Sequence, residues 1–278
     1  MIRILITLLF FSLSLFAQPS VAVSIAPQKY FSQQIMGEDA KIVVMVPSGA
    51  APDTYAPKPS QLRVLKNVSL YFSIGVEFEK NWLERFRAIN PDMKIIDTTK
   101  GIQKQTLQAH HDNHHHHEGL DPHIWLSPKL VMIEAKHICD ALIVNDPQNK
   151  AKYEKNYEAF VKRLQHLDSE IKGILAPLKQ RNFIVFHPAF GYFADAYNLH
   201  QIAIEKAGKS PTIRQIKQII DFAKAKDIHT IFVAPQFSQK AAKQIATLSH
   251  AKVVTIDPLS PDWENNLRQI AKSFEKAN

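Results

Sequence analysis

Two series of short apolar runs, each alternating with helix-patterned segments, are the feature of this 278-residue sequence that most limits its fold. The runs are apolar throughout instead of alternating with polar residues, which is typical of strands covered on both faces. We therefore predict an α/β fold of two (β/α)4 lobes, with mainly parallel sheets and helices on both sides of each sheet. The expected strands are 21–25, 41–46, 69–74 and 94–97 in the first series, and 182–187, 201–205, 230–234 and 252–256 in the second. The expected helices lie near 28–37, 59–66, 77–89 and 129–143, and then near 189–198, 212–226, 237–248 and 262–276.

A long helix is predicted between the two series. Asp146 offers an N-cap, Pro147 suits the first helical position, and apolar residues then recur at steps of four and three. A single helix of about 28 residues, ending before Pro177, would be about 42 Å long and would run along both lobes. Because one rigid helix hinges poorly, little lobe closure is expected. The expected domains are an N-terminal lobe over 18–145, a linking helix over 146–177 and a C-terminal lobe over 178–278. The recurring apolar residues are Tyr153, Tyr157, Phe160, Leu164, Leu167, Ile171 and Ile174.

The first 17 residues predict export from the cytoplasm. Arg3 is followed by an apolar run over 4–16 that ends at Ala17, which is the pattern of a secretory signal peptide over 1–17. The run is too short for a membrane-spanning helix, which needs about 20 residues. We expect cleavage after Ala17, with Ala22 as the alternative, and a periplasmic mature protein.

The sequence has a single cysteine, Cys139, which limits disulfide formation and lipid attachment. It excludes an intrachain disulfide, and no cysteine that could carry a lipid stands at the expected mature N-terminus. We therefore predict a periplasmic protein without a lipid anchor. Cys139 falls in the helix-patterned stretch 129–143 and is expected to be a small core residue, not a nucleophile.

The net charge of +8, from 34 Lys and Arg against 26 Asp and Glu, is spread along helix-like segments. Dispersed charge is typical of solvated helix faces and not of a groove that follows phosphates, so nucleic acid is not an expected partner. The sequence also lacks a His-Glu-x-x-His helix, a Gly-x-Ser-x-Gly elbow and a Gly-rich phosphate loop. A secreted zinc hydrolase is therefore the weaker alternative, and we predict a binding protein, not an enzyme.

A histidine-rich segment over 108–120 has no apolar period and is expected to form an exposed loop. Imidazoles bind zinc, copper and nickel, and several of them on one loop can collect such ions at low affinity without fixing a geometry. A merely polar loop is the alternative. The histidines are His110, His111, His114, His115, His116 and His117.

Two histidines and two aspartates lie at the ends of expected strands or in turns of the two lobes. His123 lies between a proline turn and a helix start, and His187 ends the first strand of the second series, where open α/β sheets place ligand sites. Asp53 follows the second strand, and Asp257 follows the last. Because the carboxyl ends of strands in two facing lobes define one cleft, we predict that these side chains bind one divalent metal ion. Mixed nitrogen and oxygen ligands suit zinc, manganese or iron(II), and the alternative for either aspartate is a turn residue only.

Six motifs follow one another along the chain, at 47–59, 121–128, 186–192, 210–212, 235–237 and 256–259. In this order they resemble a family of bacterial solute-binding proteins that deliver zinc or manganese to ABC importers, most closely the zinc-uptake ZnuA type. The resemblance spans essentially the whole mature chain and includes a histidine-rich loop just before the second ligand. It implies two lobes joined by a long helix, a metal in the cleft between them, and His123 and His187 as ligands. It also implies an ABC-type zinc permease in the inner membrane as partner, with other periplasmic zinc carriers as further partners. We expect the protein to be a monomer.

The sequence departs from this family where the metal would bind. The family motif of the first lobe carries a histidine where this chain has Asp53, so the usual three-histidine zinc site is reduced to two. Either Asp53 takes over as a carboxylate ligand, or Asp257, which matches a direct ligand of manganese-binding relatives, completes the site with water. Oxygen ligands favour manganese or iron(II), yet Zn²⁺ outcompetes Mn²⁺ in most sites. We expect high-affinity zinc capture and delivery. The alternatives are a manganese or iron(II) carrier, and a zinc buffer or adhesin without a transport role.

Overall fold

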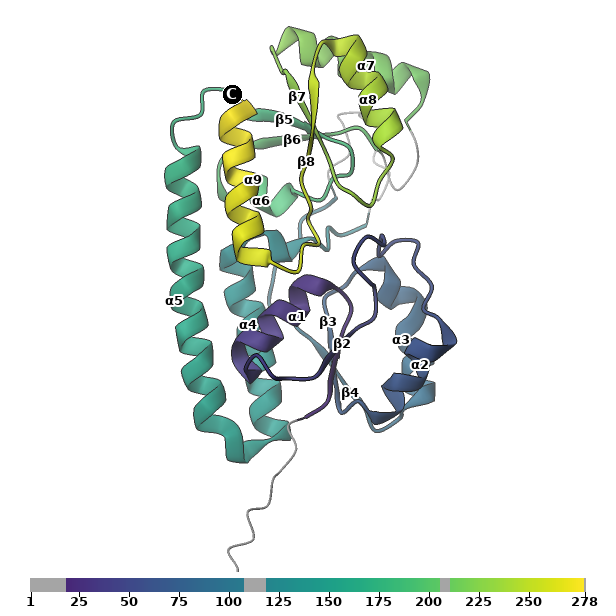
Figure 1. Cartoon of the computed structure of the whole chain (residues 1–278), viewed down its shortest axis with the longest axis vertical. Helices are drawn as coiled ribbons and strands as arrows, with labels where there is room; N and C mark the ends of the chain where they lie inside the picture. The colour runs from purple at the N-terminus through teal and green to yellow at the C-terminus, as the bar shows by residue number, and fades with distance from the viewer. Residues whose placement is uncertain (1–18, 108–118, 206–210, 278) are drawn as a thin grey trace, which may run out of the picture.

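The computed structural model of the chain describes residues 19–107, 119–205 and 211–277. The expected signal peptide and the six histidines of the predicted loop lie outside the described residues. The described residues form two four-stranded sheets, one in each lobe, and every strand pair is parallel (Figure 1). The predicted α/β fold of two parallel lobes is therefore confirmed. The strands are β1 Val21–Val23, β2 Ile42–Val44, β3 Leu70–Ser73, β4 Lys94–Asp97, β5 Asn182–Val185, β6 His200–Ala203, β7 Thr230–Val233 and β8 Lys252–Thr255.

The two sheets have the same topology, with orders β2-β1-β3-β4 and β6-β5-β7-β8. In each sheet the first strand of the lobe pairs with both the second and the third, so the strand order reverses beside β1 and beside β5. In open α/β sheets, ligands bind outside the carboxyl ends of the strands at such a reversal. His187, two residues beyond the end of β5, lies beside one of these reversals.

The strands are shorter than the apolar runs that predicted them. The run 41–46 gives a strand of only three residues, Ile42–Val44, and Met45 and Val46 beyond it remain buried. Ile25 and Ile74 likewise follow their strands and stay buried. An apolar run in the sequence indicates that its residues are buried, whereas a strand also requires pairing of the backbone with a neighbouring strand. The apolar runs therefore extend past the ends of the strands.

Each of the eight helices predicted within the lobes is present, with ends that differ from the prediction by at most two residues. Local sequence explains the boundaries. The Thr212 hydroxyl accepts a hydrogen bond from the backbone N–H of Gln215 at 3.3 Å, and the backbone N–H of Thr212 donates to the side-chain oxygen of Gln215 at 2.8 Å. This capping box starts α7. The helices are α1 Ala26–Met36, α2 Pro59–Val64, α3 Glu77–Ile89, α4 Pro128–Asn145, α5 Lys150–Leu175, α6 Gly191–Ala196, α7 Ile213–Ala225, α8 Gln239–Ser249 and α9 Trp263–Ala277.

The linking helix α5 has 26 residues and runs along both lobes (Figure 1). The predicted linker is confirmed, but its first turn, Pro147–Asn149, is a 3-10 turn and not the start of the α-helix. The Asp146 side chain makes no capping hydrogen bond at this turn. It accepts hydrogen bonds from the side chains of Asn149 at 2.8 Å and Tyr153 at 2.7 Å instead.

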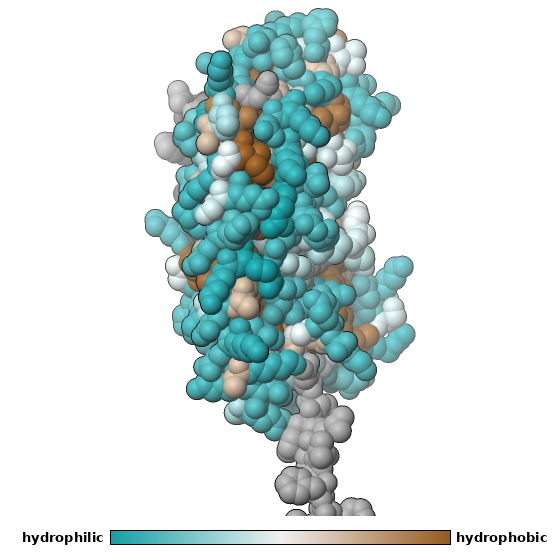
Figure 2. Space-filling model, turned by 60° about the vertical axis from the view of Figure 1, so that its left-hand side comes forward, coloured by the Kyte–Doolittle hydropathy of each residue, from teal (hydrophilic) through white to brown (hydrophobic). Residues whose placement is uncertain are grey.

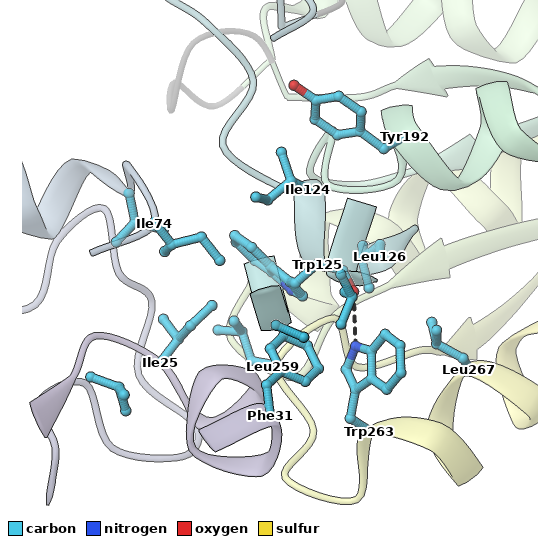
Figure 3. Close-up of a cluster of buried hydrophobic side chains, with 14 of the residues drawn as sticks. Ile25, Phe31, Ile74, Ile124, Trp125, Leu126, Tyr192, Leu259, Trp263 and Leu267 are labelled. Carbon is cyan, nitrogen blue, oxygen red and sulfur yellow. Dashed lines mark hydrogen bonds between the residues drawn. The ribbon is translucent and has the colours of Figure 1, made fainter. Parts of the chain in front are cut away.

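The larger hydrophobic core crosses from one lobe to the other. Trp125 of the N-terminal lobe donates its indole N–H to the carbonyl of Pro258 at 2.7 Å, and Trp263 at the start of α9 donates to the carbonyl of Trp125 at 2.8 Å (Figure 3). Both indoles are almost completely buried and pack with Phe31 of α1 and Leu259. The lobes are thus joined by packed side chains as well as by α5.

The surface in the view of Figure 2 is mostly hydrophilic, with apolar side chains in small separate groups. Within the described residues, none of the helices combines the length and the apolar content that a membrane crossing requires. Cys139 is buried in α4, as the sequence predicts for a small core residue.

Candidate metal centre

The two predicted histidine ligands face each other across the lobes. His123 precedes the 3-10 turn Ile124–Leu126 of the N-terminal lobe, and His187 lies two residues beyond the end of β5 in the C-terminal lobe. Their ring centroids are 5.4 Å apart, with the ring planes at 73°. Both residues are at least nine-tenths buried.

Each imidazole is held on its Nδ1 side by a buried carboxylate. Asp121 Oδ1 lies 2.7 Å from His123 Nδ1 and also accepts the His123 backbone N–H at 2.9 Å. Glu205 Oε2 lies 2.8 Å from His187 Nδ1. Because a carboxylate only accepts hydrogen bonds, these contacts assign a proton to Nδ1 in both rings, and a neutral ring of this tautomer offers its lone pair at Nε2. This arrangement of carboxylate and imidazole is the one that orients histidines toward bound metals.

Aromatic rings fix the planes of the same imidazoles. Phe237 stacks on His187 with centroids 4.3 Å apart and planes at 14°. Trp125 lies against His123 with centroids 5.0 Å apart. The two rings are therefore held in orientation by packing and by hydrogen bonds, so little ordering remains to be done when a ligand binds.

The separation of the two rings fits one shared metal ion. A zinc ion bound through Nε2 at about 2.1 Å lies about 3.2 Å from the ring centroid, so two imidazoles at a tetrahedral angle have centroids about 5 Å apart. The observed value is 5.4 Å. The pair can serve as two ligands of a tetrahedral ion without a large movement of either lobe.

The two predicted aspartates are placed differently. Asp53 Oδ2 lies 4.0 Å from His187 Nε2, and the Asp53 side chain is 40% exposed. Asp257 Oδ1 instead accepts hydrogen bonds from the Gln236 side chain at 2.8 Å and from the Leu259 backbone at 2.9 Å. Across the described ranges, no three His, Cys, Asp or Glu side chains already converge as a metal cage. The structure thus places His123 beside His187 and Asp53 near His187, and it pairs Asp257 with its own loop and Gln236.

Sequence analysis did not identify Asp121 or Glu205 as partners of the histidines. The signal for Asp121 was available, because it stands two residues before His123 in an Asp-Pro-His motif. The signal for Glu205 required the pairing of strands: Val185 of β5 is opposite Ala203 of β6, and the same register continued by two residues brings His187 beside Glu205. That pairing cannot be derived from the local pattern of either strand.

Two parallel α/β lobes joined by a long helix, with an imidazole from each lobe at the interface, define a two-lobed metal-binding protein of the solute-binding class. The chain belongs to the family described as "Zinc-uptake complex component A periplasmic", whose sequence pattern matches residues 21–277. As a member, it is a periplasmic metal-binding component of a transport system and not an enzyme, which confirms the sequence prediction.

Solved and curated proteins agree with this assignment. A crystal structure of ZnuA superimposes with a TM-score of 0.89 at 42% identity, over 94% of this chain and 99% of that chain. The high-affinity zinc uptake system protein ZnuA of Bacillus subtilis is 27% identical over 86% of this chain and 78% of its own length. The manganese-binding lipoprotein MntA of Halalkalibacterium halodurans is 29% identical over 72% of this chain and 66% of its own length.

Proposed function

We propose that the chain is a high-affinity zinc-binding protein that captures Zn²⁺ between its two lobes and delivers it to an ABC-type permease in the inner membrane. His123 and His187 are the proposed nitrogen ligands, and Asp53 and Asp257 are the proposed oxygen ligands. The observation that carries the proposal is the pair of imidazoles, one from each lobe, with centroids 5.4 Å apart and each with Nδ1 held by a buried carboxylate. Binding alone is the chemistry that this site performs.

Zinc is the proposed cargo because of the two imidazoles, the family's description and the relative named for zinc uptake. Manganese is the second candidate, because Asp53 and Asp257 would add oxygen ligands and one relative is named for manganese. For either metal the Asp53 carboxylate has to move closer to His187 than it stands here, since Asp53 Oδ2 is 4.0 Å from His187 Nε2.

The decisive experiment is anaerobic competition of Zn²⁺ and Mn²⁺ for the protein without residues 1–17 and 110–117, with bound metal counted by mass spectrometry. One tightly held zinc ion is expected, absent in His187→Ala and weakened in Asp53→Ala. His229→Ala is the matched control, because His229 also pairs with a carboxylate, Asp227 at 3.0 Å, but is 63% exposed. Tight zinc that survives His187→Ala would rule out this site, and one tightly retained manganese ion would make the protein a manganese carrier.

The histidines at 110–117 are proposed as a separate, low-affinity collection point for metal. Deleting this segment should lower the total number of bound zinc ions and leave the tight one in place. If the deletion removes all tight binding, the segment is the main site and the protein is a zinc buffer.

Delivery and location are tested separately. Zinc uptake into vesicles that contain the cognate permease should require the metal-loaded protein, and the His187→Ala variant should not support it. Uptake that is unchanged without the protein would leave it as a buffer or adhesin. Residues 1–17 are proposed to direct export and then to be removed, and N-terminal sequencing of the periplasmic form should find Gln18, or Val23 if cleavage follows Ala22.

A further inference from the structure

The two proposed histidine ligands differ in where their orienting carboxylates are anchored. Glu205 follows β6, so it belongs to the same lobe as His187. Asp121 belongs to the N-terminal segment of His123, but its surroundings come partly from the other lobe. The contacts of Asp121 therefore decide how His123 is held.

Tyr192 of α6 reaches across from the C-terminal lobe to this segment (Figure 3). Its phenol oxygen donates to the carbonyl of Asp121 at 2.9 Å and accepts the backbone N–H of Gln105 at 3.0 Å. The Tyr192 side chain is almost fully buried, and this burial raises the pKa of its hydroxyl to about 12, so the hydroxyl keeps the proton that it donates.

The same two backbone segments also pair with each other. The Asp121 N–H donates to the Gln105 carbonyl at 2.8 Å, and the Leu107 N–H donates to the Gly119 carbonyl at 3.1 Å. Tyr192 thus binds both sides of a short antiparallel pair, one side of which leads directly to His123. Among the described side chains, only the Tyr192 phenol forms hydrogen bonds with both the Gln105 N–H and the Asp121 carbonyl.

Gly191, the neighbour of Tyr192, provides a second contact with Asp121. A Cβ atom built on Gly191 would lie 2.7 Å from Asp121 Oδ2 and 3.6 Å from the Gln105 side-chain oxygen. The Asp121 carboxylate therefore rests against the bare backbone of α6. Its other oxygen, Oδ1, receives the two hydrogen bonds from His123.

We infer that Tyr192 is a positioning residue of the metal site: it fixes the segment of Asp121 from the opposite lobe, and Asp121 in turn orients His123. This inference rests on the proposed function, in which His123 is a metal ligand. It has a consequence for release. A displacement of the lobes that breaks the Tyr192 contacts loosens His123, whereas the His187 pair with Glu205 stays intact within its own lobe. His123 is then the first ligand to dissociate from the metal.

Tyr192→Phe tests the inference, because it removes only the hydroxyl and keeps the buried ring. Tyr197→Phe is the matched control: Tyr197 lies directly after α6, is equally buried and donates to Asp168 Oδ1 at 3.2 Å, away from the histidines. Loss of a partner that orients a metal ligand lowers metal affinity about tenfold or more. We expect a rise of about tenfold in the zinc dissociation rate for Tyr192→Phe, and no change for Tyr197→Phe.

A second readout uses the metal-free protein. In ¹⁵N-labelled Tyr192→Phe, the Nδ1–H signal of His123 should broaden and the Asp121 amide should exchange faster, while the Nδ1–H signal of His187 stays sharp. A general loosening of the C-terminal lobe would affect His187 as well, and Tyr197→Phe would produce it too. Either result, or an unchanged His123 signal together with an unchanged dissociation rate, overturns the inference.

Gly191→Ala provides an independent variant, since its Cβ would push the Asp121 carboxylate away from His123. Gly173→Ala in α5 is its control, because a Cβ there meets no atom within 4 Å. Faster zinc dissociation is expected for Gly191→Ala only. If the wild-type protein holds no tight metal, the proposed function fails, while the imidazole signals still decide whether Tyr192 positions His123.

Discussion

The two hydrophobic cores of the described residues differ in what they connect. The larger core contains side chains of the N-terminal sheet such as Tyr71, of the linking helix such as Phe160, and of the C-terminal lobe such as Phe183. The smaller core lies within the C-terminal lobe, between its sheet and the pair α7 and α8, with Ile219 and Ile231 among its members. The larger core joins the two lobes, and the smaller core packs only α7 and α8 onto the C-terminal sheet.

The strands of the C-terminal sheet explain how two cores arise in one lobe. Along β5, Phe183 and Val185 belong to the larger core and Ile184 belongs to the smaller one. Along β7, Ile231 belongs to the smaller core and Phe232 to the larger. Side chains of a strand alternate between faces, so one face of this sheet joins the packing between lobes and the other face carries α7 and α8.

This difference bears on the metal site. His123 precedes Trp125, which is part of the larger core, whereas His187 lies between Phe186 of the smaller core and Ala189 of the larger one. Separating the lobes would break packing of the larger core, but loosening α7 and α8 would not. The layer of α7 and α8 is therefore the part of the molecule with the lower expected cost of local opening.

The largest predicted effect is that of breaking the core between the lobes with Trp125→Ala. The change removes a fully buried indole and its hydrogen bond to Pro258, and truncation of a buried tryptophan costs about 3–5 kcal/mol. Urea unfolding should show a lower midpoint, and hydrogen exchange should show faster opening in both lobes. Trp82→Ala is the control, because Trp82 is only partly buried and packs within the N-terminal lobe on α3.

A different outcome would break the comparison of the cores. If Trp125→Ala raised hydrogen exchange in α1 and left α9 and β5 unchanged, the larger core would not be one cooperative unit. The two lobes would then have to be held together by α5 alone.

The sequence predicted the helices and strands well, because burial produces a local pattern of apolar residues. It predicted the metal site less completely, because no local pattern records how the side chains of the site are oriented. The apolar runs located every described strand, the end of one run located His187, and the proline turn before a helix located His123. The runs overestimated strand length where buried residues such as Ile25 and Ile74 follow the last residue of a strand. The roles of Asp121, Glu205 and Tyr192 depend on pairings between segments that are distant in the sequence or in the fold, and no local pattern encodes them.

The ligand roles of Asp53 and Asp257 remain predictions. Asp53 stands near His187, in agreement with its place after the second strand, but the 4.0 Å distance to Nε2 is longer than the about 3.4 Å that separates two ligands of one tetrahedral zinc. Asp257 Oδ1 accepts hydrogen bonds from Gln236 and Leu259, as a turn residue would. The competition experiment with Asp53→Ala distinguishes these roles.

The next effect concerns the smaller core. Ile219→Ala in α7 removes a side chain that is 2% exposed, and such truncations cost about 2–4 kcal/mol. Faster hydrogen exchange is expected in α7 and α8, with α1 and α4 unchanged. Ile213→Ala is the matched control on the same helix, since Ile213 is 88% exposed and its truncation should leave exchange as it is. Equal acceleration in the N-terminal lobe would show that the two cores act as one.

The prediction with the smallest effect near pH 5 contrasts the buried carboxyl of Glu134 in α4 with Glu205, which has His187 as a partner. Glu134 of α4 is fully buried, and its Oε2 atom has no hydrogen-bond partner among the described residues. Thr98 contacts the other oxygen at 3.3 Å, but its single hydroxyl proton also serves the Ser73 carbonyl at 2.8 Å. Burial therefore raises the pKa of Glu134 from its ordinary value of 4.5 to about 8.

The sign of the pH dependence follows from this shift. Between pH 4.5 and about 8 the unfolded chain releases the Glu134 proton while the folded chain keeps it, so the stability that the neutral carboxyl contributes is lost as pH rises through this window. Glu134→Gln does not titrate. Its free energy of unfolding should lie below that of the wild type by about 1 kcal/mol near pH 5, because the amide brings two N–H donors to a position where Oε2 has no partner in the described ranges, and should exceed it near pH 8. Chemical unfolding at the two pH values measures the crossing. Glu77→Gln, at an exposed carboxylate paired with Lys80, should show none, and parallel curves for Glu134→Gln would mean that this carboxyl is ionised inside the folded lobe.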